Sequence, residues 1–407
     1  MMEDDYRKKI LVVSPNSIYP VDMACKVRII DTMSSLSEDF EVDVAFLTNG
    51  QRQSIKNTED LKAITRRQFP IQIPNDTWIK RKIIGAWIWL KSMVTLNPRE
   101  YYYTNFKCIN RKLKKILRDK QYDVLLIEYW FQCGLMEGLK DNIVKIVDTH
   151  DVLSDKIILR NKGQISTLQK QRYRKYLNLE TKNIGKADLV ISISEQDHDI
   201  YTKRFPNLRH LLMPMGKDIK KNSKGSVCNK KGENILFYGG MGSEQNIGAF
   251  NRFWSNIYPY IKNEMPNIKC YVVGSNPPDS IKTLHDGKNV FVTGFVDNVR
   301  DYIQRCDVMI LPLGIGTGFR GRVLDVMGLG VPVIGTHNAL DCMGMQSGVH
   351  GFISDSDHEM AKIAVNYLSD NDLRKKMSQK CQEFIIEKYS IEKTYKKLNA
   401  TINEMIS

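Results

Sequence analysis

The sequence has 407 residues, of which 42% are hydrophobic and 26% are charged, and its net charge is +14. This composition excludes a disordered or fibrous protein and is sufficient for two domains, each with its own core. The cysteines are scattered without a Cys-x-x-Cys pair, the charged segment Met1–Lys9 is not followed by the apolar h-region of a signal peptide, and no run reaches the length of a membrane span. We therefore expect a cytoplasmic protein without a signal peptide, a zinc site or a disulfide framework.

Short apolar runs alternate with longer segments of helical periodicity. Several runs are apolar throughout, as expected of strands that are buried on both faces of a parallel sheet. The strands expected in the first half are Ile10–Ser14, Val42–Leu47, Val124–Ile127, Val144–Asp148, Leu189–Ile193 and Leu211–Met213. Those expected in the second half are Ile235–Tyr238, Cys270–Val273, Val290–Thr293, Val308–Pro312, Pro332–Gly335 and Phe352–Ile353. After Ser354 only helices are expected, and the whole pattern predicts doubly wound α/β sheets.

Two segments mark the organisation of the chain. Ser243 is expected to cap a helix whose apolar stripe is Ile247, Phe250, Trp254 and Ile257. The polar, basic stretch Met215–Asn234 lacks periodicity and indicates a linker. We predict Rossmann-like domains over residues 1–215 and 216–389, with a C-terminal helix at about 390–407 packing back on the first. Ligands of such sheets bind at the carboxyl ends of the strands, so the cleft between the domains is the expected active site.

The segment Trp78–Lys91 mixes lysine and arginine with three tryptophans. It is either a domain helix with one buried apolar face and one solvated basic face, or a helix that lies at an anionic membrane surface. A second basic cluster lies at Arg111–Lys120, and the other basic residues are dispersed along the chain. This distribution argues against nucleic-acid binding, which favours a concentrated basic stripe with stacking aromatics.

The stretch Leu311–Thr336 contains the clearest chemical signal. A buried strand ends at Pro312, a glycine-rich loop covers Gly314–Gly318, and a helix with Arg320, Arg322 and Asp325 is expected to follow. Glycines let the backbone approach a ligand closely, and the start of a helix offers unpaired N–H groups to a phosphate. The arginines add positive charge, and the aspartate can accept hydrogen bonds from a ribose. These features predict a nucleotide-diphosphate site.

Gly316–Gly321 also matches the dinucleotide-binding fingerprint, with Asp341 about 20 residues further on. That fingerprint belongs to the first βαβ unit of its domain, whereas only one or two strands follow it here. We therefore reject an NAD(P)-dependent enzyme.

The sequence resembles glycosyltransferase family 4, whose members have the two-domain GT-B fold. The resemblance covers most of the chain and rests on motifs that occur in the family's order. In the first half they are Asp148–Val152, Ala187–Ser194 and Pro214–Gly216, and in the second half Ile235–Met241, Asn246, Cys270–Gly274, Val290–Val296 and Gly316–Pro332.

The resemblance implies a role for each matching position. Asp325 would hold the donor ribose, Gly239 and Gly240 would lie against the pyrophosphate, and Gly294, Phe295 and Val296 would form the turn that reads the nucleobase. The loop residues Gly316, Thr317 and Gly318 would complete the donor site. His150 would face the transferred sugar as a catalytic residue, a structural histidine being the alternative. Asp22, Arg28 and Asp151 would lie on the acceptor side, with a helix N-cap as the alternative for Asp151.

The sequence departs from the family at several positions. Gly240 and Gln245 stand where many members have an arginine and a lysine, so Arg320 and Arg322 are expected to neutralise the leaving diphosphate. Thr317 replaces the first glutamate of the two-glutamate motif. Glu180, in an expected helix, is assigned to the surface. The departures leave a non-catalytic partner subunit as an alternative, and a GT-B nucleotide-sugar epimerase is another.

The resemblance implies a retaining glycosyltransferase, a hexosyl- or N-acetylhexosaminyltransferase, that needs no metal and no cofactor beyond its donor. We expect a UDP-sugar donor, with a GDP-sugar as the alternative. The acceptor would be a glycan, lipid-linked or protein group. The basic first half favours a membrane-associated intermediate of polysaccharide or glycolipid assembly, and peripheral contact with the inner membrane face.

Overall fold

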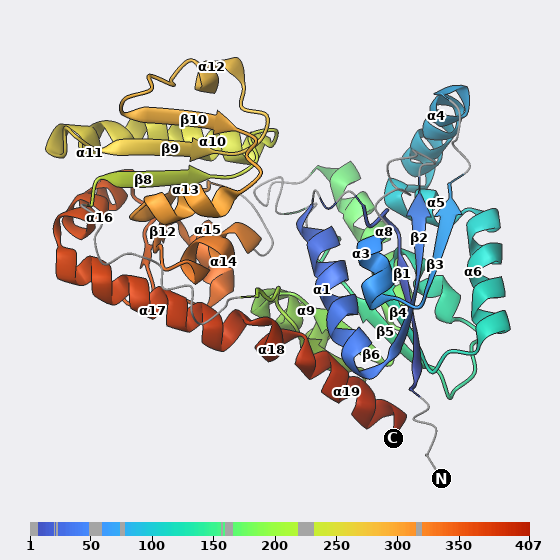
Figure 1. Ribbon diagram of the computed structural model, residues 1–407. Coiled ribbons are helices and arrows are strands. Elements are labelled where there is room, and N and C mark those ends of the chain that lie inside the picture. The colour runs from blue at the N-terminus through green and yellow to red at the C-terminus, as the bar shows by residue number, and fades with distance from the viewer. Residues whose placement is uncertain are drawn as a thin grey trace, which may run out of the picture. The chain divides into compact units, whose positions relative to one another are not determined.

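A computed structural model describes residues 7–19, 21, 23–48, 59–73, 78–155, 158, 166–218, 232–314 and 320–407. The chain forms two compact units (Figure 1). Unit 1 comprises Met1–Gly216 and Thr394–Ser407, and unit 2 comprises Lys217–Lys393. Each unit is an α/β domain with its own parallel sheet, which is the GT-B architecture that the sequence predicts.

The sheet of unit 1 has seven parallel strands in the order β3-β2-β1-β4-β5-β6-β7. Its strands are β1 (Lys9–Ser14), β2 (Glu41–Thr48), β3 (Arg67–Gln72), β4 (Val124–Glu128), β5 (Val144–Asp148), β6 (Leu189–Ser192) and β7 (Arg209–Leu212). The order reverses between β1 and β4, so the carboxyl ends of these strands flank a switch point where ligands of doubly wound sheets bind.

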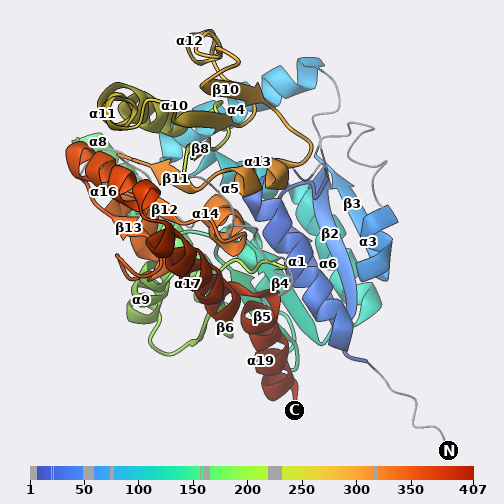
Figure 2. The same ribbon diagram turned by 60° about the vertical axis from the view of Figure 1, so that its left-hand side comes forward.

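Helices cover both faces of this sheet. They are α1 (Ala24–Asp39), α3 (Glu59–Ile64), α4 (Trp78–Thr95), α5 (Arg99–Thr104), α6 (Lys107–Lys120), η1 (Trp130–Met136), α8 (Thr167–Ile184), α9 (Glu195–Arg204) and α19 (Lys396–Ile406). Leu11 and Val13 pack in one cluster with Ile109 and Leu113 of α6. Alternate residues of a strand point to opposite faces, and α1 covers the other face, as Figure 2 shows. The C-terminal α19 packs against α1, where Asn399 donates to the Ser35 carbonyl at 2.8 Å.

The sheet of unit 2 has six parallel strands in the order β10-β9-β8-β11-β12-β13. Its strands are β8 (Asn234–Tyr238), β9 (Lys269–Val273), β10 (Val290–Gly294), β11 (Val308–Leu311), β12 (Val333–Gly335) and β13 (Phe352–Ile353). The order reverses between β8 and β11. The same topological rule therefore places its ligand site at the carboxyl ends of these strands.

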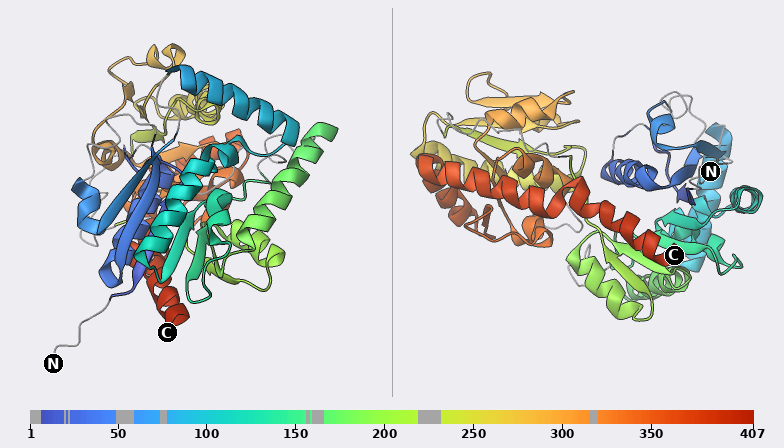
Figure 3. Two further views of the ribbon diagram at one scale, coloured as in Figure 1. Left: turned by 90° about the vertical axis from the view of Figure 1, so that its right-hand side faces the viewer. Right: turned by 60° about the horizontal axis from the view of Figure 1, so that its bottom comes forward.

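The helices of unit 2 lie on both faces of its sheet (Figure 3). They are α10 (Glu244–Arg252), the π-helical turn η3 (Phe253–Ile257), α11 (Tyr258–Glu264), α12 (Asp279–Lys282), α13 (Val299–Arg305), α14 (Gly321–Gly328), α15 (His337–Leu340), η4 (Asp341–Met343), α16 (Asp357–Ser369), α17 (Asn371–Tyr389) and α18 (Ile391–Thr394). As expected, no strand follows Ser354, and the chain continues through α16, α17, α18 and α19.

Every strand expected from the sequence is present, but β3 was not expected. Its proline, Pro70, has no amide hydrogen to donate to a sheet, and β3 is an edge strand with β2 as its only neighbour. Only Ile71 of this strand is buried, so the sequence shows no apolar run there.

The helix after Ser243 buries a different set of residues from the stripe that the sequence predicts. Ser243 precedes α10 as expected, but its side chain makes no capping hydrogen bond. The π-helical turn shifts the register after Arg252, because each π turn contains one extra residue. Phe253 is therefore buried with Phe250, while Trp254 is half-buried and stacks on Phe250 at a centroid distance of 5.9 Å.

Candidate functional site

Three glycine turns lie side by side at the carboxyl ends of β8, β9 and β10. Gly239 donates its N–H to the Val273 carbonyl at 3.0 Å, and Gly274 donates to the Gly294 carbonyl at 3.2 Å. A Cβ on Gly274 would collide with the backbone carbonyl of Gly239, so this close approach requires glycine. The structure thus brings the predicted donor residues Gly239, Gly240 and Gly294 to one edge of the sheet. Phe295 follows with a side chain that is 75% exposed.

Arg322 of α14 lies over the first of these turns. Its Nη1 donates to Asn246 Oδ1 at 2.8 Å, and Asn246 Nδ2 donates to the Gly240 carbonyl at 2.7 Å. A Cβ on Gly239 would collide with Arg322 Nη1. The guanidinium and the first glycine turn therefore share one small space, and the phosphate role of both stays a prediction.

The charge on Arg322 is poorly compensated. Burial, together with the nearby charge of Arg320, lowers the pKa of Arg322 to about 10. Its buried Nε has no hydrogen-bond partner within the described part of the chain, and no described carboxylate pairs with it. A buried cation without a counter-ion is costly, and an anionic ligand would relieve that cost.

Asp325 lies one turn beyond Arg322 on the same helix. Its Oδ1 forms an ion pair with Lys217 Nζ at 2.6 Å, and each of the two side chains is 28% exposed. Burial and the charge of Asp325 raise the pKa of the neighbouring Tyr238 to about 12. The carboxylate is therefore partly accessible and lies near Tyr238, the last residue of β8 before the first glycine turn. The predicted loop residues Gly316, Thr317 and Gly318 lie outside the described residues.

Unit 1 has a second group of polar residues, at the carboxyl ends of β4 and β5. Tyr129 follows β4 and His150 follows β5, and both have positive φ angles, of 62° and 58°. Their rings stack with centroids 4.1 Å apart and planes 8° from parallel. Non-glycine residues in this backbone region are strained, and such strain concentrates at functional sites.

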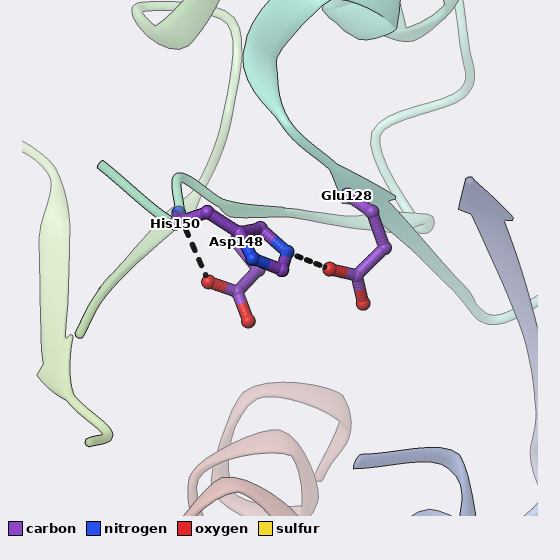
Figure 4. A group of neighbouring side chains, drawn as sticks. All are labelled: Glu128, Asp148 and His150. Carbon is purple, nitrogen blue, oxygen red and sulfur yellow. Dashed lines mark hydrogen bonds and ion pairs between the residues drawn. The ribbon is translucent and has the colours of Figure 1, made fainter. Parts of the chain in front are cut away.

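Beneath this stack, Glu128, Asp148 and His150 form a buried cluster (Figure 4). His150 Nε2 lies 2.5 Å from Glu128 Oε2, and Arg28 Nε donates to Asp148 Oδ2 at 2.8 Å. Burial disfavours the charge on Arg28, but Asp148 offsets this effect and raises the Arg28 pKa. Burial also raises the pKa of Glu128. Arg28 already pairs with Asp148, and His150 is hydrogen-bonded to Glu128, so we interpret the cluster as a buried polar network and assign no metal to it.

A cavity of about 820 Å³ opens beside the cluster in unit 1. Its walls come from the end of β2, from the segments that follow β1, β3, β4 and β5, and from α1, α5 and α8. They include Asn16, Lys26, Tyr103, Tyr129, Phe131 and Asp151. The cavity has the size of a small-molecule site and combines aromatic surfaces with charged groups.

The predicted acceptor-side residues differ in how they relate to this cavity. Asp151 lines it, whereas Arg28 is fully buried against Asp148 and has no surface to offer an acceptor. Asp22 lies outside the described residues. His150 is 4% exposed and is covered by Tyr129, which lines the cavity in its place. Its role in sugar transfer stays a prediction.

The surface assignment of Glu180 is wrong. Its carboxylate is buried in α8, accepts from Ser154 Oγ at 2.5 Å and from the Leu153 N–H at 3.1 Å, and pairs with Arg204 at 3.2 Å. Tyr201 OH donates to it at 3.2 Å. The polar partners come from a distant helix and from a loop, so no local pattern reveals them. Glu180 fixes residues 153–154, and thereby the cavity wall at Leu153.

Other residues of the site were not singled out from the sequence. Glu128 directly follows an expected buried strand, which is a local signal for a site residue. Lys217 directly follows the motif Pro214–Gly216, but no sequence pattern marks this lysine as a site residue. Tyr129 is identified only in the structure, by its positive φ angle.

Residues 232–370 match the protein family described as "Glycosyl transferases group 1". Unit 2 contains a glycosyl transferases group 1 domain. The matched range covers all strands of the second sheet and the glycine turns with Arg322 and Asp325.

Two curated proteins are similar to this chain. N-acetyl-alpha-D-glucosaminyl L-malate synthase of Bacillus anthracis is 29% identical over 132 residues, which are 31% of this chain and 34% of that protein. The chain thus aligns with about a third of that relative's length. An uncharacterized 44.6 kDa protein in the cps region of Klebsiella pneumoniae is 21% identical over 95% of this chain and 98% of that protein.

Solved structures share the fold over nearly the whole chain. Sucrose-phosphate synthase from Thermosynechococcus elongatus has a TM-score of 0.70 at 15% identity, covering 98% of this chain and 99% of that one. HepE of Anabaena, solved with UDP-glucose, has a TM-score of 0.63 at 15% identity, with coverages of 97% and 99%. An S. aureus TarM mutant, solved with fondaparinux, alpha-GlcNAc-glycerol and UDP, has a TM-score of 0.63 at 12% identity, with coverages of 97% and 100%. The fold of the chain is GT-B.

Proposed function

We propose that this protein is a glycosyltransferase that uses a nucleotide-diphosphate sugar bound at the glycine turns of unit 2. The observation that supports this most directly is Arg322, a largely buried cation without a described counter-ion, held over Gly239 by Asn246. A diphosphate would supply the missing negative charge, and the bond to the transferred sugar breaks as that charge develops. Arg322 and Arg320 would stabilise the leaving diphosphate more in the transition state than in the ground state.

The donor is proposed to be a UDP-sugar that is transferred with retention of configuration. HepE, which shares the fold, has been solved with UDP-glucose, and the name of the Bacillus anthracis relative refers to an N-acetylglucosaminyl group. A hexosyl and an N-acetylhexosaminyl group are both compatible with these similarities. Asp325 would bind the ribose, Phe295 would lie against the nucleobase, and no metal is expected to take part.

The acceptor is proposed to bind in the cavity of unit 1. Tyr103, Tyr129 and Phe131 offer ring faces to a sugar, and Asp151 offers a carboxylate to its hydroxyl groups. The TarM mutant that shares the fold has been solved with fondaparinux and alpha-GlcNAc-glycerol, so glycan-like ligands are known for this architecture.

The outer face of α4 supports a membrane-associated acceptor. Ile83, Trp87, Leu90 and Val94 follow helical spacing and are all exposed, and Lys80, Lys82 and Lys91 flank them. An apolar stripe flanked by lysines suits an anionic bilayer surface. No described helix has the length and apolar character to cross a bilayer. The inner side of α4 packs on α5, which lines the cavity, so a lipid-linked acceptor could reach the cavity from the surface.

A thermal-shift panel tests the donor. UDP, GDP, ADP and CMP are compared on the wild type and on Asp325→Ala. We expect UDP to raise the melting temperature of the wild type and to lose this effect in the variant. If no nucleotide stabilises the wild type, the donor site is assigned wrongly and a non-catalytic subunit becomes the better description. Conversion of the donor sugar without any acceptor would instead indicate an epimerase.

Flotation with liposomes tests the membrane surface. We expect binding to vesicles that contain anionic lipid but not to neutral vesicles, and loss of binding in Trp87→Ser/Leu90→Ser. The matched control is Tyr260→Ser, which removes an exposed aromatic side chain from unit 2. Equal flotation of the wild type and the α4 variant would contradict the proposal.

A further inference from the structure

Lys217 is fixed at the point where the chain enters unit 2. Its N–H donates to the Tyr389 carbonyl at 2.8 Å, and its carbonyl accepts from the Ile391 N–H at 3.2 Å, so it forms a parallel bridge with Ser390. Ser390 and Ile391 lie where the chain leaves unit 2. The entering and leaving segments of this unit are thus paired at Lys217.

The side chain of Lys217 connects this pair of segments to the donor site. Its Nζ lies 2.6 Å from Asp325 Oδ1, and the Asp325 side chain is 28% exposed, so its carboxylate is open to a ligand. Exposed ion pairs contribute little to the stability of a protein, because two mobile side chains must be ordered to form them. Here both side chains are only 28% exposed, so solvent and salt screen the pair less than a fully exposed one, and it joins α14 to the segment that is bridged to Ser390.

We propose that Lys217 is a positioning residue for nucleotide binding. It holds Oδ1 of Asp325, so that Oδ2 faces the ribose hydroxyls of the donor. The inference rests on the proposed donor site. The positive charge of Lys217 also offsets part of the negative charge of Asp325, which would otherwise repel a diphosphate bound nearby.

A second consequence follows from the backbone of Lys217. A nucleotide that binds Asp325 with the ion pair intact stabilises the bridge between Lys217 and Ser390. Amide hydrogen exchange at Lys217 and Ile391 should therefore become slower when UDP binds. This readout needs no acceptor and no catalytic turnover.

Calorimetric titration with UDP and with uridine tests the role of Lys217. We expect Lys217→Met to weaken both ligands roughly 5-fold, the scale of about 1 kcal/mol for a partly exposed charge pair. Lys217→Arg should restore most of the affinity. The matched control is Lys282→Met, which removes the exposed pair with Asp279 in the same unit and should leave both affinities unchanged. In an Asp325→Ala background, Lys217→Met should have no further effect.

The outcomes separate this inference from the proposed function. Failure of the wild type to bind UDP would overturn the donor site and the role of Lys217 together. Normal UDP affinity in Lys217→Met, with exchange at Ile391 unchanged by UDP in the wild type, would overturn the role of Lys217 alone. A folding defect in Lys217→Met would appear as a lower melting temperature without nucleotide, and Lys217→Arg then decides the question.

Discussion

Replacing Arg322 by methionine separates two effects of the buried charge: its effect on the stability of the ligand-free protein and its effect on UDP binding. Methionine keeps an apolar stem but removes the guanidinium. The fall in the Arg322 pKa from 12.5 to about 10 corresponds to about 3 kcal/mol against the charged form. Partial exposure reduces this figure, and Asn246 loses a hydrogen bond of about 1 kcal/mol. We therefore expect the free energy of unfolding of the ligand-free protein to rise by about 1 kcal/mol.

The same substitution should weaken UDP binding strongly. A charge-assisted hydrogen bond to a diphosphate contributes about 2–3 kcal/mol, so the affinity should fall roughly 30- to 150-fold. Uridine, which has no phosphate, should bind with nearly unchanged affinity. Urea unfolding and calorimetric titration measure the two effects independently.

A matched control and a clear refutation are available for Arg322. Arg252 lies in the same unit and pairs with Asp357 at 2.5 Å, so Arg252→Met should lower stability and leave UDP binding intact. If Arg322→Met instead destabilises the ligand-free protein and weakens UDP and uridine equally, Arg322 is a structural residue. In that case the assignment of the phosphate site to Gly239 and Gly240 would also be wrong.

Three further predictions address neighbouring parts of the structure. Gly274→Ala should lower the UDP affinity and the melting temperature, because the new Cβ would collide with the Gly239 carbonyl. The control is Gly240→Ala, whose Cβ would lie 3.6 Å from Ser275 Oγ, an ordinary contact, and which should leave the melting temperature unchanged. Equal effects of the two variants on the melting temperature would argue against the close approach of the turns. Replacing Arg320 and Arg322 together with methionine should abolish sugar transfer in a coupled UDP-release assay, and near-normal activity would place the phosphate charge elsewhere. Burial raises the pKa of Glu180 in the folded state above its ordinary value of 4.5. The protonated side chain therefore adds to the free energy of unfolding in full below pH 4.5, and this contribution is lost as the pH rises through the raised pKa. The unfolding free energy of the wild type relative to Glu180→Gln should therefore fall with rising pH in this window, by at most about 1.4 kcal/mol per pH unit, and parallel profiles would refute this account.

Local patterns predicted most of the fold. The strands whose residues are all buried, such as β4, β6, β11 and β12, appear in the sequence as largely apolar runs, because both of their faces are covered by other elements. β3 was missed because an edge strand with a proline and a single buried residue has no such run. The stripe at Trp254 was misplaced because a π-helical turn changes the helical period without a visible sequence signal.

The sequence by itself also singled out most of the residues that we propose for the donor site. Glycines at strand ends, arginines at a helix start and a carboxylate one turn later fall within short segments, where spacing fixes their relation. Only the tertiary structure decided their partners. Asn246 bridges Arg322 to Gly240, Lys217 holds Asp325, and Glu128 holds His150 beneath Tyr129. Each of these contacts joins different strands, helices or loops, so it depends on how the sheet brings its carboxyl ends together rather than on any local pattern.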